Sequence, residues 1–153
     1  MTLAPPNGEL VTQAWLAKYV GIPAGLIASS LPKIDPKSET NWTAFFTVRA
    51  LPAGSANPDL VERRSSVLQL DAWGRAQRSP KPPWGAAMAA LERVRLATRR
   101  DAQTFGRPLD MPVSGYQTAR VLVAYLTSEP TRVEGDPSGF AHMTCDLAVD
   151  WTV

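Results

Sequence analysis

The residues from which catalytic and metal sites are usually built are scarce in this sequence, which has one cysteine and one histidine among 153 residues. These two residues cannot form a closed zinc site, and a disulfide within the chain needs a second cysteine. No apolar run reaches the roughly 20 residues that span a bilayer. The N-terminus also lacks the charged and apolar regions of a secretory signal. We therefore expect no membrane partner and no disulfide or zinc framework.

Nucleotide-binding and hydrolase motifs are missing as well. The sequence has no GxGxxG segment after a strand pattern, no GxxxxGK[ST] phosphate loop and no GxSxG nucleophile elbow. Asp146 and Asp150 share one face of a predicted strand, but the strand rise separates them by about 13 Å, too far for a glycosidase pair. The sequence therefore predicts a protein that is not an enzyme and that holds no cofactor or metal.

The composition is that of one globular domain over residues 1–153, with 44% hydrophobic and 20% charged residues. The net charge is only +2, but its distribution is uneven. Residues 61–107 carry ten basic and four acidic side chains, whereas residues 108–153 carry two basic and six acidic ones. Such a division could create opposed surface potentials that dock copies head to tail. Scattered solvated charge is the alternative interpretation.

Two helices are predicted from apolar periodicity. The first covers residues 9–20, with Asn7 as its N-cap and Gly21 where a C-terminal glycine ends a helix. The second runs from residue 84 to about residue 100 and is rich in alanine, which lets a helix approach a sheet closely. Its predicted core side carries Trp84, Met88, Leu91 and Arg95, with Ala87, Val94 and Thr98 adjoining.

Five strands are predicted, at residues 25–32, 42–51, 62–74, 117–128 and 139–153. In the third, Ser66, Leu68, Leu70 and Ala72 alternate with Val67, Gln69, Asp71 and Trp73, and in the fourth Val121, Val123 and Tyr125 share a face. In the last, Ala141, Met143, Cys145, Leu147, Val149 and Trp151 form one apolar face. The segments predicted as loops are 33–41, 52–59, 75–83, 105–115 and 129–139. The order predicts an α+β fold with two helices on a mostly antiparallel, mixed sheet of about five strands.

The lone histidine and cysteine fall on opposite faces of the last predicted strand. His142 is on the polar face, which predicts a surface residue without a partner, and Cys145 is on the apolar face, which predicts a core residue. Glu134 and Asp136 lie in a segment whose composition predicts a solvated loop tip. Among the five tryptophans, Trp15, Trp84 and Trp151 are predicted to lie in or beside the core, and Trp42 and Trp73 are left as half-exposed candidates.

This arrangement resembles the tail terminator proteins of phages with long, non-contractile tails, the lambda-like siphophage family. The resemblance extends over about residues 8–152 and is strongest in LQLDAWG, residues 68–74, and in the DPSGF turn, residues 136–140. The segments 75–83 and 99–115 are longer than the corresponding links of the family. Segments 75–83 and 105–115 are predicted as flexible loops, and their composition permits ordering on assembly without predicting it. The resemblance implies a tail-terminator-like fold.

The resemblance also implies a structural role in the virion. Tail terminators form a hexameric ring on the finished tail tube, stop further addition of subunits and present the surface that docks to the head. The implied partners are copies of the chain itself, the tail tube protein and a head-tail connector or stopper protein. Double-stranded DNA would pass through the lumen without sequence recognition. The implied location is the head-tail interface of the virion, after assembly in the host cytoplasm.

Six charged residues are the candidates for subunit or tube contacts, because a ring needs two different complementary faces on each subunit. They are Arg63, Arg64, Arg99, Arg100, Glu134 and Asp136. Two alternatives to the terminator stay open. One is another neck protein, such as a head-tail connector or stopper. The other is a small nucleic-acid-binding accessory protein that uses Arg93, Arg95, Arg99 and Arg100.

Overall fold

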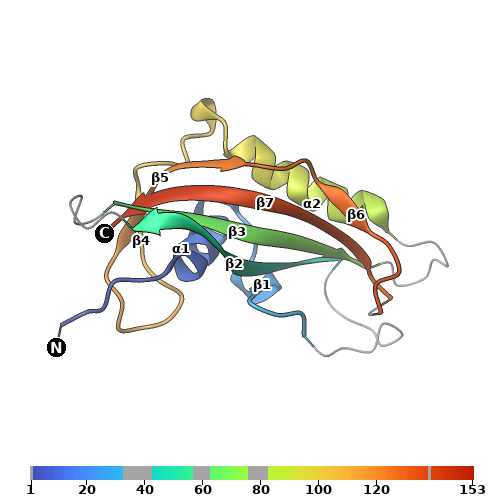
Figure 1. The fold of residues 1–153 in the computed structure, drawn as a ribbon, viewed down its shortest axis with the longest axis horizontal. Coiled ribbons are helices and arrows are strands. Elements are labelled where there is room, and N and C mark those ends of the chain that lie inside the picture. The colour runs from blue at the N-terminus through green and yellow to red at the C-terminus, as the bar shows by residue number, and fades with distance from the viewer. Residues whose placement is uncertain (1, 33–42, 57–62, 76–82, 138) are drawn as a thin grey trace.

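Two α-helices and seven strands make up the α+β fold of the computed structural model, which describes residues 2–32, 43–56, 63–75, 83–137 and 139–153 (Figure 1). The α-helices are α1 (Gly8–Trp15), which continues as a π-helical turn (Leu16–Val20), and α2 (Trp84–Ala97). Short 3-10 helices cover Ala24–Leu26 and Arg100–Ala102. The strands are β1 (Ile27–Ala28), β2 (Ala44–Ala56), β3 (Arg63–Gly74), β4 (Pro108–Leu109), β5 (Ala119–Leu126), β6 (Thr131–Val133) and β7 (Ala141–Thr152).

All seven strands belong to one curled sheet with the order β1-β2-β3-β7-β5-β4, and β6 pairs with β7 beside β5. The β1–β2 pair is parallel and the other pairs are antiparallel, so the predicted mixed, mostly antiparallel sheet is confirmed. The predicted count of five strands is too low. Strands β4 and β6 lie within the predicted loops 105–115 and 129–139, and segments of two or three residues are too short to show a period.

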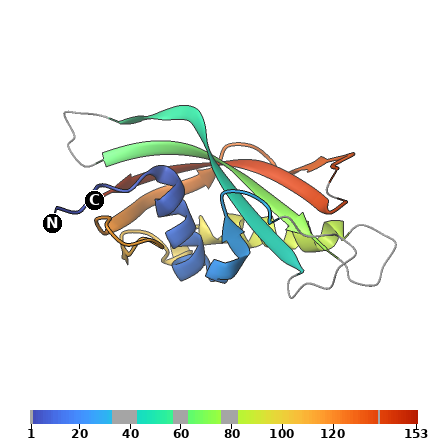
Figure 2. The same ribbon diagram turned by 90° about the horizontal axis from the view of Figure 1, so that it is seen from below.

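The core lies between the sheet and the helices, which cover the same face (Figure 2). Its largest fully buried side chains include Trp15, Trp151, Leu16, Leu68, Leu70, Leu91 and Met143. The N-cap and stop residues of the first helix are confirmed, because Asn7 Oδ1 accepts a hydrogen bond from Leu10 N at 2.9 Å and Gly21 has a φ of 81°. None of the helices among the described residues is long and apolar enough to cross a membrane.

The buried stripe of helix α2 matches the predicted one at Ala87, Leu91 and Val94 but not at Met88 and Arg95. The buried residues are Ala87, Leu91, Val94 and Ala97, whereas Met88 is 43% exposed and Arg95 is exposed. Alanines on several sides of this helix leave its apolar periodicity weak, so the sequence does not determine which stripe faces the sheet. The helix also ends at Ala97 rather than near Arg100, and a separate 3-10 helix follows.

Irregularities in two strands, β2 and β5, depart from what the sequence pattern predicts. Strand β2 continues through the predicted linker 52–59 as far as Ala56, because an irregularity between Ala50 and Gly54 absorbs Pro52. Gly54 has a φ of 94°, and a Cβ there would lie 2.3 Å from the carbonyl oxygen of Ser65. The remaining linker residues, 57–59, and the predicted loop 33–41 lie outside the described residues.

In β5 the irregularity lies between Val121 and Val123. Val121 is buried in the core, but Val123 and Tyr125 are exposed on the other face, so the prediction that all three share a face is wrong. The extra residue at the bulge reverses the alternation, and Ala124 becomes the next core residue.

The tryptophans follow the prediction where the structure describes them. Trp15 and Trp151 are fully buried, and Trp84 is partly buried against the core. Trp73 is half-buried on the sheet face that the helices leave open. Trp42 lies outside the described residues.

Gly74 sets how closely α2 packs on β3. A Cβ at this position would lie 2.7 Å from the carbonyl oxygen of Pro83 and 3.4 Å from the Ala87 Cβ. We expect Gly74→Ala to lower the free energy of unfolding by about 1–3 kcal/mol, because helix and strand must separate. Gly85→Ala in α2, where nothing lies within 4 Å, is the matched control and should be neutral or stabilising. Urea unfolding measures both, and equal midpoints would contradict the tight-contact explanation.

Candidate functional site

The open face of the sheet carries a row of polar side chains that come from three neighbouring strands. The register aligns Thr47 of β2 with Asp71 of β3 and Thr144 of β7. One step further along, Trp73 of β3 lies opposite His142 of β7. Because successive residues of a strand point to opposite faces, these side chains lie on the face opposite to Leu70 and the core.

His142 lies between two carboxylates that come from different parts of the chain. Its Nε2 is 2.7 Å from Asp71 Oδ1, and its Nδ1 is 3.0 Å from Asp136 Oδ2 in the turn after β6. The three side chains are 9–13% exposed. The imidazole ring also stacks on Trp73, with 3.8 Å between ring centroids and 15° between planes. The ring is therefore held on two edges and one face.

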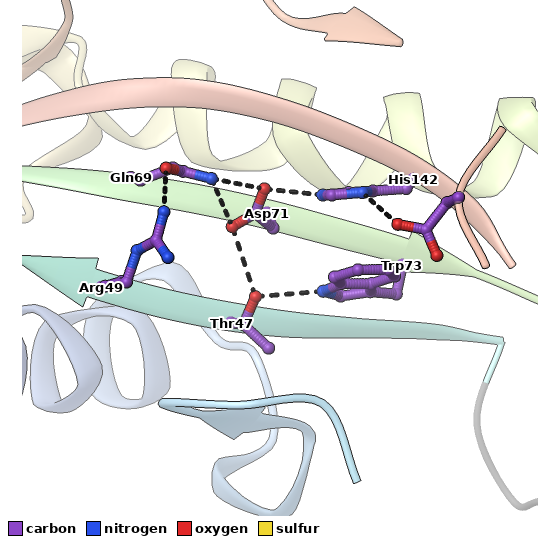
Figure 3. Close-up of polar contacts among 7 residues, drawn as sticks. Thr47, Arg49, Gln69, Asp71, Trp73 and His142 are labelled. Carbon is purple, nitrogen blue, oxygen red and sulfur yellow. Dashed lines mark hydrogen bonds and ion pairs between the residues drawn. The ribbon is translucent and has the colours of Figure 1, made fainter. Parts of the chain in front are cut away.

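Further hydrogen bonds extend this cluster across β3 to β2 (Figure 3). Gln69 Nε2 donates to both oxygens of Asp71 at 3.2 Å, and Arg49 Nη2 donates to Gln69 Oε1 at 2.7 Å. Trp73 Nε1 donates to Thr47 Oγ1 at 3.0 Å. We call Thr47, Arg49, Gln69, Asp71, Trp73, Asp136 and His142 the polar cluster.

The electrostatics of the polar cluster favour a charged imidazole. Burial alone lowers the pKa of His142, but the hydrogen bonds to Asp71 and Asp136 and their negative charges outweigh burial and raise it. Burial likewise raises the pKa of Asp71, but hydrogen bonds from His142, Gln69 and Thr144 outweigh burial and lower it. Only the doubly protonated ring can donate to both carboxylates. His142 is thus engaged on both nitrogens and offers neither to a substrate in this arrangement.

These findings correct two predictions. His142 is 8% exposed and bound on both sides, so it is not a surface residue without a partner. Asp136 is not a solvated tip, because its carboxylate binds His142. Alternation placed both His142 and Asp71 on the polar faces of their strands, but only the pairing of β3 with β7 brings them together. The signal that the sequence offers for this cluster is therefore that each residue lies on the polar face of its strand. That signal does not show which residues meet, because the register between the strands is needed for this.

Cys145 is in the core, as predicted. Its thiol is 2% exposed, and burial, followed by the charges of Asp146 and Asp71, raises its pKa to about 12. The thiolate is the nucleophilic form of cysteine, so this thiol is poorly suited to nucleophilic chemistry at neutral pH. Among the described residues, no group of three or more His, Cys, Asp or Glu side chains is arranged to hold a metal ion.

The six predicted contact residues do not form one cluster. Arg63 and Arg64 pair with Thr152 and Trp151 at the end of β7, whereas Glu134 and Asp136 follow β6, whose last residue pairs with His142 near the start of β7. The rise of a strand over these ten residues separates the two groups by about 33 Å. Arg99 and Arg100 follow α2, and both are exposed.

Several of these side chains already have partners within the chain. Arg63 Nη2 lies 2.7 Å from Asp150 Oδ2, and Arg99 Nη2 lies 3.0 Å from Asp101 Oδ2. The Arg64 guanidinium lies over the Trp151 ring at 5.4 Å. Glu134 is exposed. The Arg63–Asp150 pair joins the basic segment to the acidic one inside one molecule.

The chain matches no protein-family model, and a search of curated proteins finds no significant match.

Asp71 is the acceptor on which the polar cluster converges, so removing it should destabilise the fold. We expect Asp71→Ala to lower the free energy of unfolding at pH 6 by about 1–3 kcal/mol, because buried donors on His142 and Gln69 lose their acceptor. Asp146→Ala is the control, because Asp146 lies on β7 and on the same face of the sheet as Asp71. This variant should change the free energy of unfolding by less than about 0.5 kcal/mol. Urea unfolding followed by tryptophan fluorescence measures both. Similar losses in the two variants would show that the cluster contributes no more than a surface charge.

Proposed function

We propose that this chain is a structural virion protein, the tail terminator of a phage with a long non-contractile tail. In this proposal six copies form a ring on the tail tube, stop its growth and present the surface that docks to the head. The proposal is supported by the position of the two segments that resemble the family most. These are residues 68–74 and the turn that begins at Asp136. They meet in the polar cluster through the contacts of His142 with Asp71 and Asp136.

The observation that carries the proposal is the separation of charge along the sheet. A closed ring uses head-to-tail contacts, so each subunit needs two different faces that complement each other. Arg63 and Arg64 lie at one end of the β3–β7 pair, and the acidic turn with Glu134 lies at the other. Opposite charges at opposite ends favour head-to-tail association of copies over self-pairing of one end. In the proposed ring, the Arg64 end of one subunit meets the Glu134 end of the next.

The two edges of the sheet also differ in a way that suits directional assembly. On the β2 edge, Glu9 Oε1 accepts a hydrogen bond from Ala50 N at 2.7 Å, and Pro52 follows, so this edge is poorly suited to adding a strand. On the β5 edge, β4 covers only Ala119 and Arg120. Beyond them Leu122, Val123 and Tyr125 are exposed, which makes this edge an apolar surface for a neighbouring subunit or the tail tube.

Contacts within the chain weigh against the nucleic-acid alternative. In the arginine cluster in and just after α2, Arg93 donates to Gly21 O at 2.9 Å, Arg95 binds Glu92 and Arg99 binds Asp101. Phosphate binding would have to compete with these partners. A head-tail connector or stopper remains the closest alternative, and it differs in binding the portal side of the neck rather than the tube.

Capping of purified tail tubes tests the proposal. We expect the protein to bind one end of each tube, with a ring of six subunits visible by electron microscopy and a sixfold stoichiometry by native mass spectrometry. Capped tubes should no longer elongate when tube protein is added. Because subunits of this kind can stay monomeric until they meet the tube, monomers in solution are compatible with the proposal. Failure to bind tubes, together with binding to portal complexes, would favour the connector.

Charge reversal tests the pairing of the two ends. We expect Glu134→Lys or Arg64→Glu alone to weaken capping by about tenfold or more, because each puts like charges at the subunit contact. Glu129→Lys, an exposed change of the same charge elsewhere in the connection before β6, is the control and should cap normally. The double variant Arg64→Glu/Glu134→Lys should recover much of the loss. A double variant as defective as the single ones would contradict direct contact between these ends.

A further inference from the structure

A surface cavity lies at the Arg64 end of the β3–β7 pair, where α1 begins beside the end of the sheet (Figure 2). Its volume is about 290 Å³, and its walls include Gly8 of α1, Gly54 of β2, Arg64 and Ser66 of β3, and Trp151 of β7. Cavities that enclose whole small molecules usually measure about 300–1,000 Å³. This cavity is therefore suited to the end of a single side chain.

The space beside Ser66 depends on the glycine that begins α1. A Cβ on Gly8 would lie 2.4 Å from Ser66 Oγ and 3.9 Å from Trp151 Nε1. Any larger residue at position 8 would therefore occupy this space or push α1 away from β3. With glycine there, α1 packs closely on β3 and the hydroxyl of Ser66 remains at the wall of the cavity.

Arg64 is held at the cavity by the buried ring of Trp151. The guanidinium carbon lies over this ring, 5.4 Å from its centroid, and Trp151 is 1% exposed. Contact with an aromatic ring uses the face of a guanidinium and leaves the N–H donors along its edge available. Arg64 is therefore a positioned cation whose donors can bind a planar anion.

No carboxylate among the described residues forms an ion pair with Arg64. Asp150, which precedes Trp151 on β7, is held on the other face of the sheet by Arg63 Nη2 at 2.7 Å and Ser65 Oγ at 2.6 Å. The carboxylate of Glu9 in the first turn of α1 accepts a hydrogen bond from the main chain of β2. The acids of these neighbouring elements are thus engaged elsewhere, and the charge of Arg64 is left without a counter-ion.

Ser66 adds a second donor to the cavity. Its Oγ accepts a hydrogen bond from Trp151 Nε1 at 3.3 Å, and its own hydrogen has no acceptor among the described residues. A carboxylate has two oxygens that accept hydrogen bonds, so one carboxylate could bind the guanidinium of Arg64 and the hydroxyl of Ser66 together. Hydrogen bonds to a charged acceptor are about twice as strong as those between neutral groups. The donors of the cavity are therefore suited to a carboxylate.

We propose that this cavity is a carboxylate-binding site and that its occupant is the side chain of Glu134 from a second copy of the chain. The cavity belongs to a single subunit, whereas the choice of a second copy rests on the proposed function. In the proposed ring, the turn after β6 of one subunit places Glu134 between Arg64 and Ser66 of the next.

Glu134 is the acid of the described residues that is best placed to leave its own chain. It is exposed, it follows β6 directly and it precedes Gly135, whose φ is 71°. Among the described residues it has no ion pair and no side-chain hydrogen bond. The other exposed acids in that part of the chain each have a polar or charged neighbour of their own: Asp101 with Arg99, Asp110 with Thr118 and Glu129 beside Arg95.

Peptide binding to the free chain tests the cavity separately from tail assembly. The probe is a peptide of residues 131–137, TRVEGDP, blocked at both ends, and the readout is the indole N–H signal of Trp151 in NMR. We expect a saturable shift of this signal. Arg64→Gln, Ser66→Ala, or Glu134→Gln in the peptide should weaken binding by about tenfold or more, because each removes a charge-assisted hydrogen bond. Arg107→Gln is the control, because Arg107 also lies over an aromatic ring, that of Tyr19, but outside the cavity, and this variant should bind normally.

The peptide experiment decides the chemistry of the site. An absent shift, equal binding of the Glu134→Gln peptide, or undiminished binding to Arg64→Gln would each overturn the proposal. Tighter binding of inorganic phosphate than of the peptide would also overturn it, and would favour the nucleic-acid alternative.

A double-mutant cycle in the capping of tail tubes tests the occupant. Ser66→Ala and Glu134→Ala should each weaken capping, and Ser66→Ala should have no further effect once Glu134 is alanine, because both remove the same contact. In a Glu129→Ala chain, the control, Ser66→Ala should keep its full effect. Independent effects of Ser66→Ala and Glu134→Ala would overturn Glu134 as the occupant. A wild-type chain that caps no tubes would contradict the proposed function, whereas the peptide experiment would still decide whether the cavity binds a carboxylate.

Discussion

The pairing of β3 with β7 is the interaction on which the rest of the structure depends. The register runs without a break from Arg63–Thr152 to Gly74–Ala141. On one face it sets Leu68 and Leu70 against Leu147 and Cys145, which are buried beneath α1 and α2. On the other face the same register sets Trp73 against His142 and assembles the polar cluster. A shift of one residue would exchange the two faces and bury the polar cluster in the apolar core.

The sequence predicts what lies within one strand or one helix far better than what lies between them. Strict alternation predicts both faces of β7 and β3, and cap residues predict the limits of the first helix, because each signal is local. The bulge in β5 reverses the alternation at a single extra residue, and the irregularity in β2 inserts two extra residues, and neither leaves a distinct pattern in the sequence. The environment of His142 depends on residues 6 and 71 positions away, Asp136 and Asp71. A histidine on a polar strand face therefore reads as exposed until its neighbouring strand is known.

The polar cluster is an unusual way to fill the open face of a sheet. Burial of an imidazole between two carboxylates is unfavourable unless each group has a partner, and apolar side chains of similar size would often be as stable. Here the partners come from β2, β3, β7 and the turn after β6, so the cluster is satisfied only when all four segments are in place. Such a network favours one arrangement of the chain over alternatives of similar stability. It also leaves a titratable group where the apolar alternative would have none.

The uneven charge of the sequence takes on a more definite meaning once the register is known. The Arg63–Asp150 pair uses part of the basic segment and part of the acidic segment inside one molecule. The difference in the sign of the charge that remains lies between the Arg64 end of the β3–β7 pair and the Glu134 end. The same strands join these ends and the polar cluster. In the proposed ring, each subunit would contribute its Glu134 end to its neighbour. Under the proposed function the subunit can stay monomeric until it meets the tube, and contacts that are individually weak and become stable only when all of them form together suit such a subunit.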